Sequence, residues 1–159
     1  MSHSIGPQLR KHWQRLENVP GGKRLFSWLL GRFVPYTGTL GATIEVLEPG
    51  HSVVRLVDRR KVRNHLRSVH AMALANLGEM ASGLALMNSL PDHMRGILAG
   101  FNIEYLKKAR GVLVAECRCE VPASLAEREV DVLCEIRNAD GDIVTVVRAQ
   151  WLIGPEKTA

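Results

Sequence analysis

The sequence predicts an α+β fold in which one curved antiparallel sheet wraps around a long central helix. A helical pattern of small and apolar residues spans 69–88, a hairpin pattern precedes it, and strand patterns follow Pro91. A helix that is apolar on several faces has to be enclosed, and antiparallel strands in succession can enclose it. With 159 residues, we expect one compact unit. It would consist of an N-terminal helical extension over 1–36 and a main domain over 37–155.

Two short helices are expected in the extension, over 7–18 and 22–33, separated by a Pro-Gly-Gly sequence at 20–22. The second helix carries a dense apolar patch. We expect this patch to pack on the rest of the protein, with attachment to a membrane surface as the alternative. Pro35 is expected to end the second helix.

The main domain is expected to begin with a hairpin and a loop. The segments 39–47 and 51–57 are rich in β-branched residues, and Pro49-Gly50 between them is a turn dipeptide. A polar loop follows over 58–68. At its end, Ser68 is expected to cap the long helix, because its hydroxyl can accept a hydrogen bond from the first helical turn.

The rest of the chain after the long helix is predicted to be strands. Turn residues at Arg110-Gly111 and at 138–142 predict antiparallel hairpins. The expected strands are 97–106, 112–121, 129–138 and 143–153.

Two glycines in the long helix need an explanation. In an exposed helix Gly78 and Gly83 would each cost up to about 1 kcal/mol relative to alanine. We therefore expect another backbone to approach the helix closely at both positions.

The formal charge of +5 indicates an anionic partner. Aromatic residues make up only 5% of the chain, so the stacking platforms typical of nucleic-acid binding are scarce. A phosphorylated small molecule fits the basic clusters at least as well, and no nucleic-acid partner is expected. The clustered cations are Arg59, Arg60, Lys61, Arg63, Lys107, Lys108 and Arg110.

Several classes of protein find no support in the sequence. No apolar run reaches the roughly 18 to 20 residues that a membrane span needs, and the N-terminus does not resemble a secretory signal, so we expect a cytoplasmic protein. Cys117, Cys119 and Cys134 lack metal-ligand spacing and are expected to be core or half-buried thiols, with metal binding or redox chemistry as the alternatives. Serine-hydrolase, zinc-protease, phosphate-loop and dinucleotide motifs are absent, and no cofactor is implied.

The strongest candidate site lies where the loop runs into the long helix. Asn64, His70, the helix start at Ala71 and Glu79 provide an amide, an imidazole, free backbone N–H groups and a carboxylate. This set suits the hydrolysis of an activated acyl group. Each residue also has a structural interpretation: Asn64 as a loop turn residue, His70 as a cap, and Glu79 as a buried carboxylate paired to an arginine.

The order of elements and this spacing resemble the hotdog-fold acyl-CoA thioesterase superfamily, in particular its 4-hydroxybenzoyl-CoA and phenylacetate-pathway type. That family carries Asn or Gln, then a His-Gly pair at the helix start, then Asp or Glu within the helix. The likeness covers 39–153. The chain departs from the family pattern at Ala71, where glycine is usual, and at Gly83, where a Ser or Thr is common and Ser82 lies beside it.

The resemblance implies a role for each site residue. The Ala71 N–H would hold the oxyanion, and Glu79 would attack the carbonyl or activate water. Asn64 would orient water or the thioester, and His70 would fix the helix start or bind the substrate. Eight residues of helix separate Ala71 from Glu79 by about 12 Å and roughly 80°. One chain therefore cannot easily direct both at one carbonyl, and the resemblance implies a homodimer, or a dimer of dimers, with its site between subunits.

The resemblance also implies where the substrate lies. Ser82 and Gly83 would line its site, and the acyl pocket is expected against the long helix, with Phe101, Tyr105, Trp28 and Phe33. Two other functions remain open: non-catalytic binding of an acyl-CoA or fatty-acyl ligand, and a basic nucleic-acid-associated domain. The cations expected to meet the coenzyme A phosphates are Lys107, Lys108, Arg110, Arg59 and Arg60.

Overall fold

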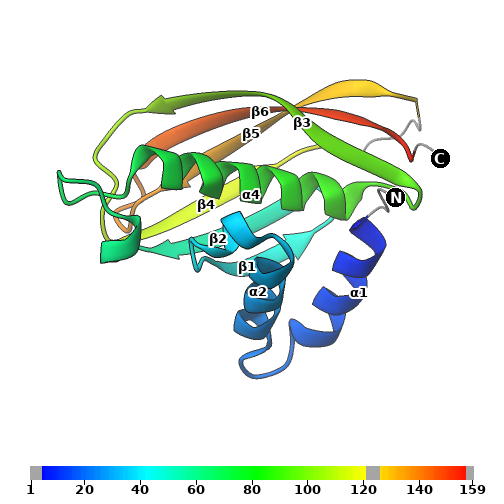
Figure 1. The fold of residues 1–159 in the computed structure, drawn as a ribbon, viewed down its shortest axis with the longest axis horizontal. Helices are drawn as coiled ribbons and strands as arrows, with labels where there is room; N and C mark the ends of the chain where they lie inside the picture. Colours follow the sequence, from blue (N-terminus) through cyan, green and yellow to red (C-terminus); the bar gives the residue numbers. More distant parts are fainter. Residues whose placement is uncertain (1–4, 121–125, 157–159) are drawn as a thin grey trace.

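The structure, a computed structural model, describes residues 5–120 and 126–156. The chain begins with three helices, continues with a hairpin and a long helix, and ends with four strands (Figure 1). The elements are α1 (Gly6–Leu16), α2 (Gly22–Phe33), α3 (Pro35–Gly38), β1 (Thr43–Glu48), β2 (His51–Val57), the 3-10 helix η1 (Arg60–Val62), α4 (Ala71–Ser89), β3 (Met94–Tyr105), β4 (Val112–Arg118), β5 (Arg128–Arg137) and β6 (Ile143–Pro155).

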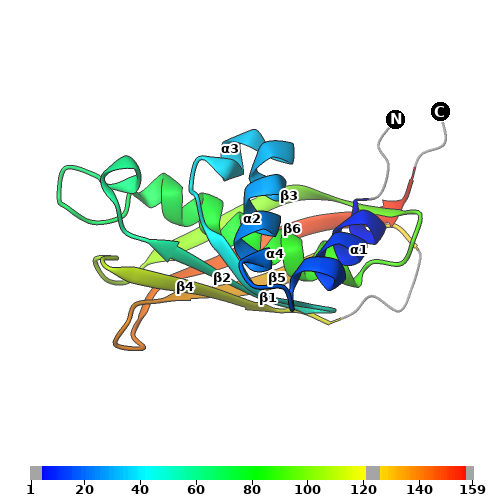
Figure 2. The ribbon, with the colours of Figure 1, turned by 90° about the horizontal axis from the view of Figure 1, so that it is seen from below.

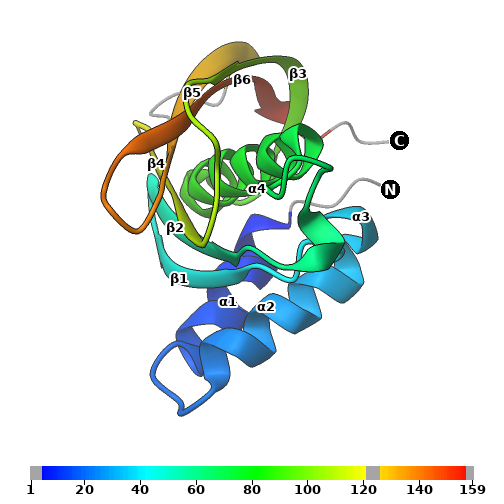
Figure 3. The same cartoon turned by 90° about the vertical axis from the view of Figure 1, so that its left-hand side faces the viewer.

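The six strands form one antiparallel sheet in the order β1-β2-β4-β5-β6-β3. Seen from the end, the sheet curls around α4, which contacts all six strands (Figure 3). The predicted α+β arrangement of a curved sheet around one long helix is therefore confirmed, and the N-terminal helices are present.

One predicted hairpin is wrong. Arg110-Gly111 does not join paired strands, because β3 pairs with β6 and β4 lies between β2 and β5. The chain after β3 instead passes the start of α4, where the N–H of Val69 donates to the carbonyl of Ala109. The second predicted turn does join neighbours. There Asn138 Oδ1 accepts from the N–H groups of Asp140 and Asp142 between β5 and β6.

Two predicted helix boundaries also need correction. Ser68 does not cap α4, because its N–H donates to Asn64 Oδ1 within the loop and His70 takes the cap position. Pro35 opens α3 instead of only ending α2. Proline is common at the first position of a helix, because the N–H that it lacks would have no partner there.

The N-terminal helices share the hydrophobic core of the sheet and α4. Trp13 of α1 and Phe26 of α2 are buried and meet edge to face at 5.1 Å between ring centroids. The apolar patch of α2 packs only in part, because Trp28 is 62% and Phe33 65% exposed. Among the described residues, no helix combines the length and apolar character needed to cross a bilayer.

Arg10 fastens α1 to the end of α4. Its guanidinium donates to the carbonyls of Asn88 and Leu90, at 3.2 and 3.0 Å, and pairs with Asp92 at 2.7 Å. These bonds satisfy carbonyls that a helix end leaves without partners. α1 and α3 contact α4, and α2 contacts β1, so the three helices extend the wall around α4 beyond the β1 edge (Figure 2).

Side chains of β6, and not another backbone, account for the two glycines of α4. A Cβ on Gly78 would lie 2.5 Å from Val147 Cγ2, and one on Gly83 would lie 3.1 Å from the indole of Trp151. The expectation of a close backbone approach is therefore wrong, although the glycines do permit close packing.

We predict that Gly78→Ala destabilises the protein by about 1 to 2 kcal/mol, because the clash with Val147 outweighs the gain in helix propensity. Urea denaturation measures the change. Gly83→Ala is the matched control, since its contact is looser, and it should leave the free energy of unfolding nearly unchanged. Equal effects of the two variants would contradict this account of the packing.

Candidate functional site

The loop before α4 is held in a fixed shape by its own hydrogen bonds. Asn64 Oδ1 accepts from the N–H groups of Leu66, at 2.9 Å, and Ser68, at 3.2 Å. Arg67 takes a left-handed conformation with φ of +55°. Arg110 donates to the carbonyls of Leu66 and Arg67, each at 3.1 Å. The side chain of Asn64 thus shapes the turn that delivers the chain to the helix start.

His70 caps α4 with its side chain. Its backbone is extended, with φ of −63° and ψ of 142°, and its ring Nδ1 accepts from the N–H of Met72 at 3.1 Å. The His70 N–H donates to the carbonyl of Val62 at 2.7 Å, which fixes the backbone on the other side. Because Nδ1 is an acceptor, the neutral ring carries its proton on Nε2. The exposed ring can therefore donate a hydrogen bond to a ligand.

Ala71 opens the helix with a free donor. Within residues 5–120 and 126–156, no group accepts a hydrogen bond from its backbone N–H. The carbonyl of Ala71 accepts from the Tyr105 hydroxyl at 3.1 Å, and burial raises the pKa of this phenol, so it stays protonated. The first turn of a helix also carries a positive partial charge. This N–H is positioned to stabilise an oxyanion.

Glu79 lies two turns further along α4 and is half-buried. No cation in the described part of the chain forms an ion pair with it, so the alternative of a carboxylate paired to a structural arginine finds no partner. Glu79 lines an apolar cavity of about 170 Å³ together with Gly83 and Trp151. A carboxylate without a counter-ion beside an apolar cavity is available to act on a ligand bound there.

The neighbouring residues Ser82 and Gly83 have different surroundings. Ser82 is buried, and its hydroxyl donates to the carbonyl of Glu79 at 3.1 Å and accepts from Trp151 Nε1 at 3.3 Å. Its hydroxyl thus points to the sheet and holds the turn that carries Glu79. Gly83 lines the same cavity as Glu79.

Three of the five cations predicted to bind the coenzyme A phosphates are already engaged with other groups of the chain. Arg59 donates to the carbonyl of Leu40, Arg110 holds the loop, and Lys107 pairs with Asp142 at 3.1 Å. Arg60 and Lys108 are exposed and form no ion pair with any described residue.

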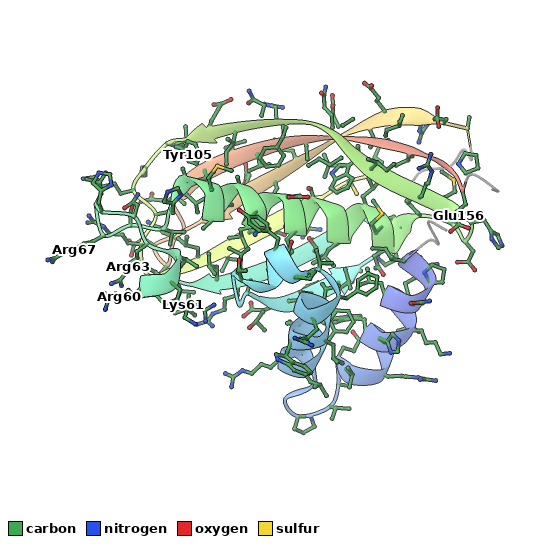
Figure 4. The ribbon with its side chains drawn as sticks, viewed as in Figure 1. Arg60, Lys61, Arg63, Arg67, Tyr105 and Glu156 are labelled. Carbon is green, nitrogen blue, oxygen red and sulfur yellow. The ribbon has the colours of Figure 1, made fainter. Side chains whose placement is uncertain are left out.

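Basic side chains gather at the end of the molecule where α4 begins. Figure 4 shows Arg60, Lys61, Arg63 and Arg67 together at this end, with Tyr105 on the strand above. Arg63 is paired with Asp58 at 2.7 Å. The start of α4 therefore lies in positive surroundings that favour an anionic ligand.

The sequence interpretation missed a cleft beside the helix start. This cleft of about 620 Å³ is bordered by His70, Asn76, Lys61 and Arg63. Asn76 is only 5% exposed, and its Nδ2 donates to the carbonyl of Tyr36 at 3.4 Å, while its Oδ1 has no hydrogen-bond partner among the described residues. An asparagine in the first half of a mostly apolar helix was the signal that could have revealed it.

Two of the three cysteines are buried thiols of the core. Cys117 and Cys134 face each other across β4 and β5 and are buried. Burial raises the pKa of the Cys134 thiol to about 12 and also raises that of Cys117, so both stay protonated near neutral pH. In residues 5–120 and 126–156, no three His, Cys, Asp or Glu side chains are placed to hold a metal ion.

Comparisons with known proteins agree with this fold. The profile of a family described as a domain of unknown function (DUF4442) matches residues 22–153. The matched part begins at the first residue of α2 and includes α4 and all of the sheet except the last two residues of β6. No curated protein matches the chain.

Solved structures share the arrangement over most of their length. A protein designated APC5556 is 27% identical, with a TM-score of 0.77 over 93% of this chain and 99% of its own. A Pseudomonas aeruginosa protein of unknown function, described as a probable thioesterase, is 20% identical, with a TM-score of 0.76 over 87% and 97%. A hypothetical thioesterase from Streptococcus pneumoniae, solved with coenzyme A, is 21% identical, with a TM-score of 0.62 over 74% and 91%.

We predict that His70→Ala lowers the free energy of unfolding by about 1 kcal/mol, because the first turn of α4 loses its cap. His70→Asn should restore that stability, since asparagine is a good cap. Thermal and urea denaturation measure both changes. If the two variants are equally unstable, the bond from Met72 N–H to the ring does not stabilise the helix start.

Proposed function

We propose that this chain, which belongs to the DUF4442 family, hydrolyses acyl-CoA or a related acyl thioester to the free acid and the thiol. The observation that carries the proposal is the pair of unused groups on α4. A helix-start N–H at Ala71 and a carboxylate at Glu79 both lack partners in the described chain. These are the oxyanion donor and the base or nucleophile that the reaction needs.

The free edge of the sheet supports a homodimer, either alone or as a dimer of dimers. β3 is an edge strand of 12 residues, and its large side chains Ile97, Phe101 and Tyr105 are exposed. A long apolar edge is normally covered, because it offers unpaired N–H and C=O groups to another strand. Pairing of β3 with its copy about a two-fold axis would make the two α4 helices neighbours. The helix start of one subunit could then face the carboxylate of the other.

The proposed reaction uses both subunits. Glu79 of one subunit takes a proton from water while the water oxygen attacks the thioester carbonyl, or the carboxylate attacks directly. The Ala71 N–H of the other subunit holds the negative oxygen that forms. The C–S bond then breaks, and in the water route the departing thiolate takes the proton that Glu79 received. In the direct route the thiolate takes a proton from solvent, and water then hydrolyses the acyl anhydride formed on Glu79, which releases the free acid and regenerates the carboxylate. His70 Nε2–H donates to the substrate, and Asn64 maintains the loop and orients the water.

Two comparisons support this assignment of residues. In a Staphylococcus aureus thioesterase that is 22% identical to this chain, alanine variants of a glutamine and of a glutamate have been crystallised. These positions lie fifteen residues apart, and fifteen residues also separate Asn64 from Glu79. The Streptococcus pneumoniae structure contains coenzyme A, which suits a coenzyme A thioester as substrate here.

Non-catalytic binding of an acyl thioester is the second candidate function. It is favoured by the hydrogen bonds that already engage Asn64 and Ser82, because both side chains serve the fold. The measurement that separates the two functions is release of free thiol.

We predict that Glu79→Gln and Ala71→Pro each reduce thiol release from acyl-CoA by about 100-fold or more. Proline removes only the N–H at this position, because the first helical residue tolerates it and the extended backbone of His70 is compatible with a following proline. Ala71→Val is the control, since it adds bulk but keeps the donor, and it should retain most of the activity.

Mixing the two inactive variants tests whether the site lies between subunits. After exchange of subunits, a mixed dimer holds one intact pair of Ala71 and Glu79, so about a quarter of wild-type turnover should return. A site within one chain would give no recovery. Full turnover by Glu79→Gln alone would refute the catalytic assignment.

We predict that the double variant Arg60→Ala, Lys61→Ala raises KM for an acyl-CoA several-fold with little change in kcat, because both cations lie at the start of α4 and can meet phosphates. The thioester of the same acid with N-acetylcysteamine lacks phosphates, and its KM should not change. Arg15→Ala at the end of α1 is the matched control. If KM rises equally for both thioesters, the cations do not act on the phosphates.

A further inference from the structure

An apolar cavity lies between the carboxylate proposed to act in catalysis and the N-terminal helices. Glu79 and Gly83 of α4 and Trp151 of β6 line this inner cavity of about 170 Å³. Ile5 and Leu9 of the α1 segment and Leu30 of α2 line it as well. Among the described residues, Glu79 is the one charged residue in the lining.

A second apolar cavity of about 270 Å³ adjoins the first. It lies between α1 and α2, where Phe26 and Phe33 line it. Ile5, Leu9 and Leu30 line both cavities and are therefore the partition between them. Leu30 is only partly buried, and we expect rotation of its side chain to join the two spaces.

We propose that these two cavities bind the acyl chain of the substrate, and that the substrate class is straight-chain fatty-acyl thioesters. This inference rests on the proposed function, because it places the reacting carbonyl at Glu79. The chain lies within the subunit that supplies Glu79, and the coenzyme A portion lies along the helix start of the other subunit.

The shape and chemistry of the space favour an alkyl chain as occupant. An acyl thioester needs a polar group at the carbonyl and an apolar path beyond it, and the described lining of the inner cavity has a single charge, at Glu79, among mostly apolar residues. A peptide would bring backbone N–H and C=O groups into a space that offers them few partners. Trp151 and Leu9 are almost fully buried, so the walls are part of the folded core.

The volumes set the expected chain length. An apolar cavity of about 150 Å³ accommodates a six-carbon ligand such as benzene. The inner cavity, at about 170 Å³, therefore suits roughly six carbons. Longer chains would pass Leu30 into the outer cavity.

The N-terminal helices are thus a specificity element. Arg10 holds α1 against the end of α4, and the N–H of Ile44 in β1 donates to Ser27 of α2 at 2.9 Å. These bonds keep the helical wall of the cavity in register with the helix that carries Glu79.

The test uses neutral and charged probes with the full-length protein. Calorimetric titration with hexanol, octanol and decanol should show affinity rising roughly fourfold per CH₂. Leu30→Trp should stop this rise near six carbons. Leu25→Trp is the matched control, because Leu25 lies on the same helix but lines neither cavity, and it should behave like wild type. Thermal denaturation must show both variants folded, and Leu30→Phe replaces Leu30→Trp if the latter does not fold.

Binding of a fatty acid tests the orientation of the acyl chain in the cavities. Octanoate should bind Glu79→Gln several-fold more tightly than wild type, because its carboxylate meets the Glu79 carboxylate in wild type. Octanol should bind both proteins equally. Equal octanoate binding by the two proteins would mean that the head of the ligand is not at Glu79 and would overturn the proposal.

Thiol release separates this inference from the proposed function. Chain-length-dependent alcohol binding that needs Leu30, without any thiol release, would support the cavity and refute the hydrolase. Thiol release that is independent of chain length and equal in Leu30→Trp and Leu25→Trp would overturn the cavity and leave the hydrolase standing. A changed sedimentation coefficient in Leu30→Trp, with unchanged alcohol binding, would assign this surface to contact between subunits and overturn the proposal.

Discussion

Enclosure of α4 is the constraint on which the rest of the structure depends. The helix has too little polar surface to face water, so the sheet has to curve around it and all six strands contact it. The small residues Gly78 and Gly83 let Val147 and Trp151 of β6 pack against the helix. Together with this packing, the hydrogen bond from Trp151 to Ser82 sets the rotation of the helix about its axis. With that rotation fixed, Glu79 is left on the side that the sheet does not fill.

The start of α4 depends on a different set of interactions. Asn64, Arg110 and the backbone of Val62 hold the preceding loop, and His70 completes the helix cap. These contacts leave the Ala71 N–H, at the positive end of the helix, without an acceptor in the described part of the chain. The same helix therefore carries an electrophilic end and an acidic middle that cannot meet within one chain, which is a physical reason for a site shared by two subunits.

The N-terminal helices add a third group of elements to the sheet and α4. They join the common core, they are tied to α4 by Arg10, and they line two adjoining apolar cavities, of which the inner one reaches Glu79. Part of α2 remains exposed around Trp28 and Phe33. The extension thus provides the walls that would select an acyl chain, while α4 provides the groups that would act on its carbonyl.

The sequence by itself determined the order and type of the long elements and the spacing of the candidate site, because helical and strand periodicity and turn residues are local properties. It located Asn64, His70, Ala71 and Glu79 before any contact was known. Only the tertiary structure decided that β3 pairs with β6, since strand pairing depends on contacts distant in sequence. It also decided that His70 and not Ser68 caps α4, that Ser82 turns to Trp151, and that Asn76 borders a cleft. In each case the outcome depends on contacts with residues distant in the sequence. Such contacts decide which of two nearby polar residues caps a helix and which way a side chain on the helix points.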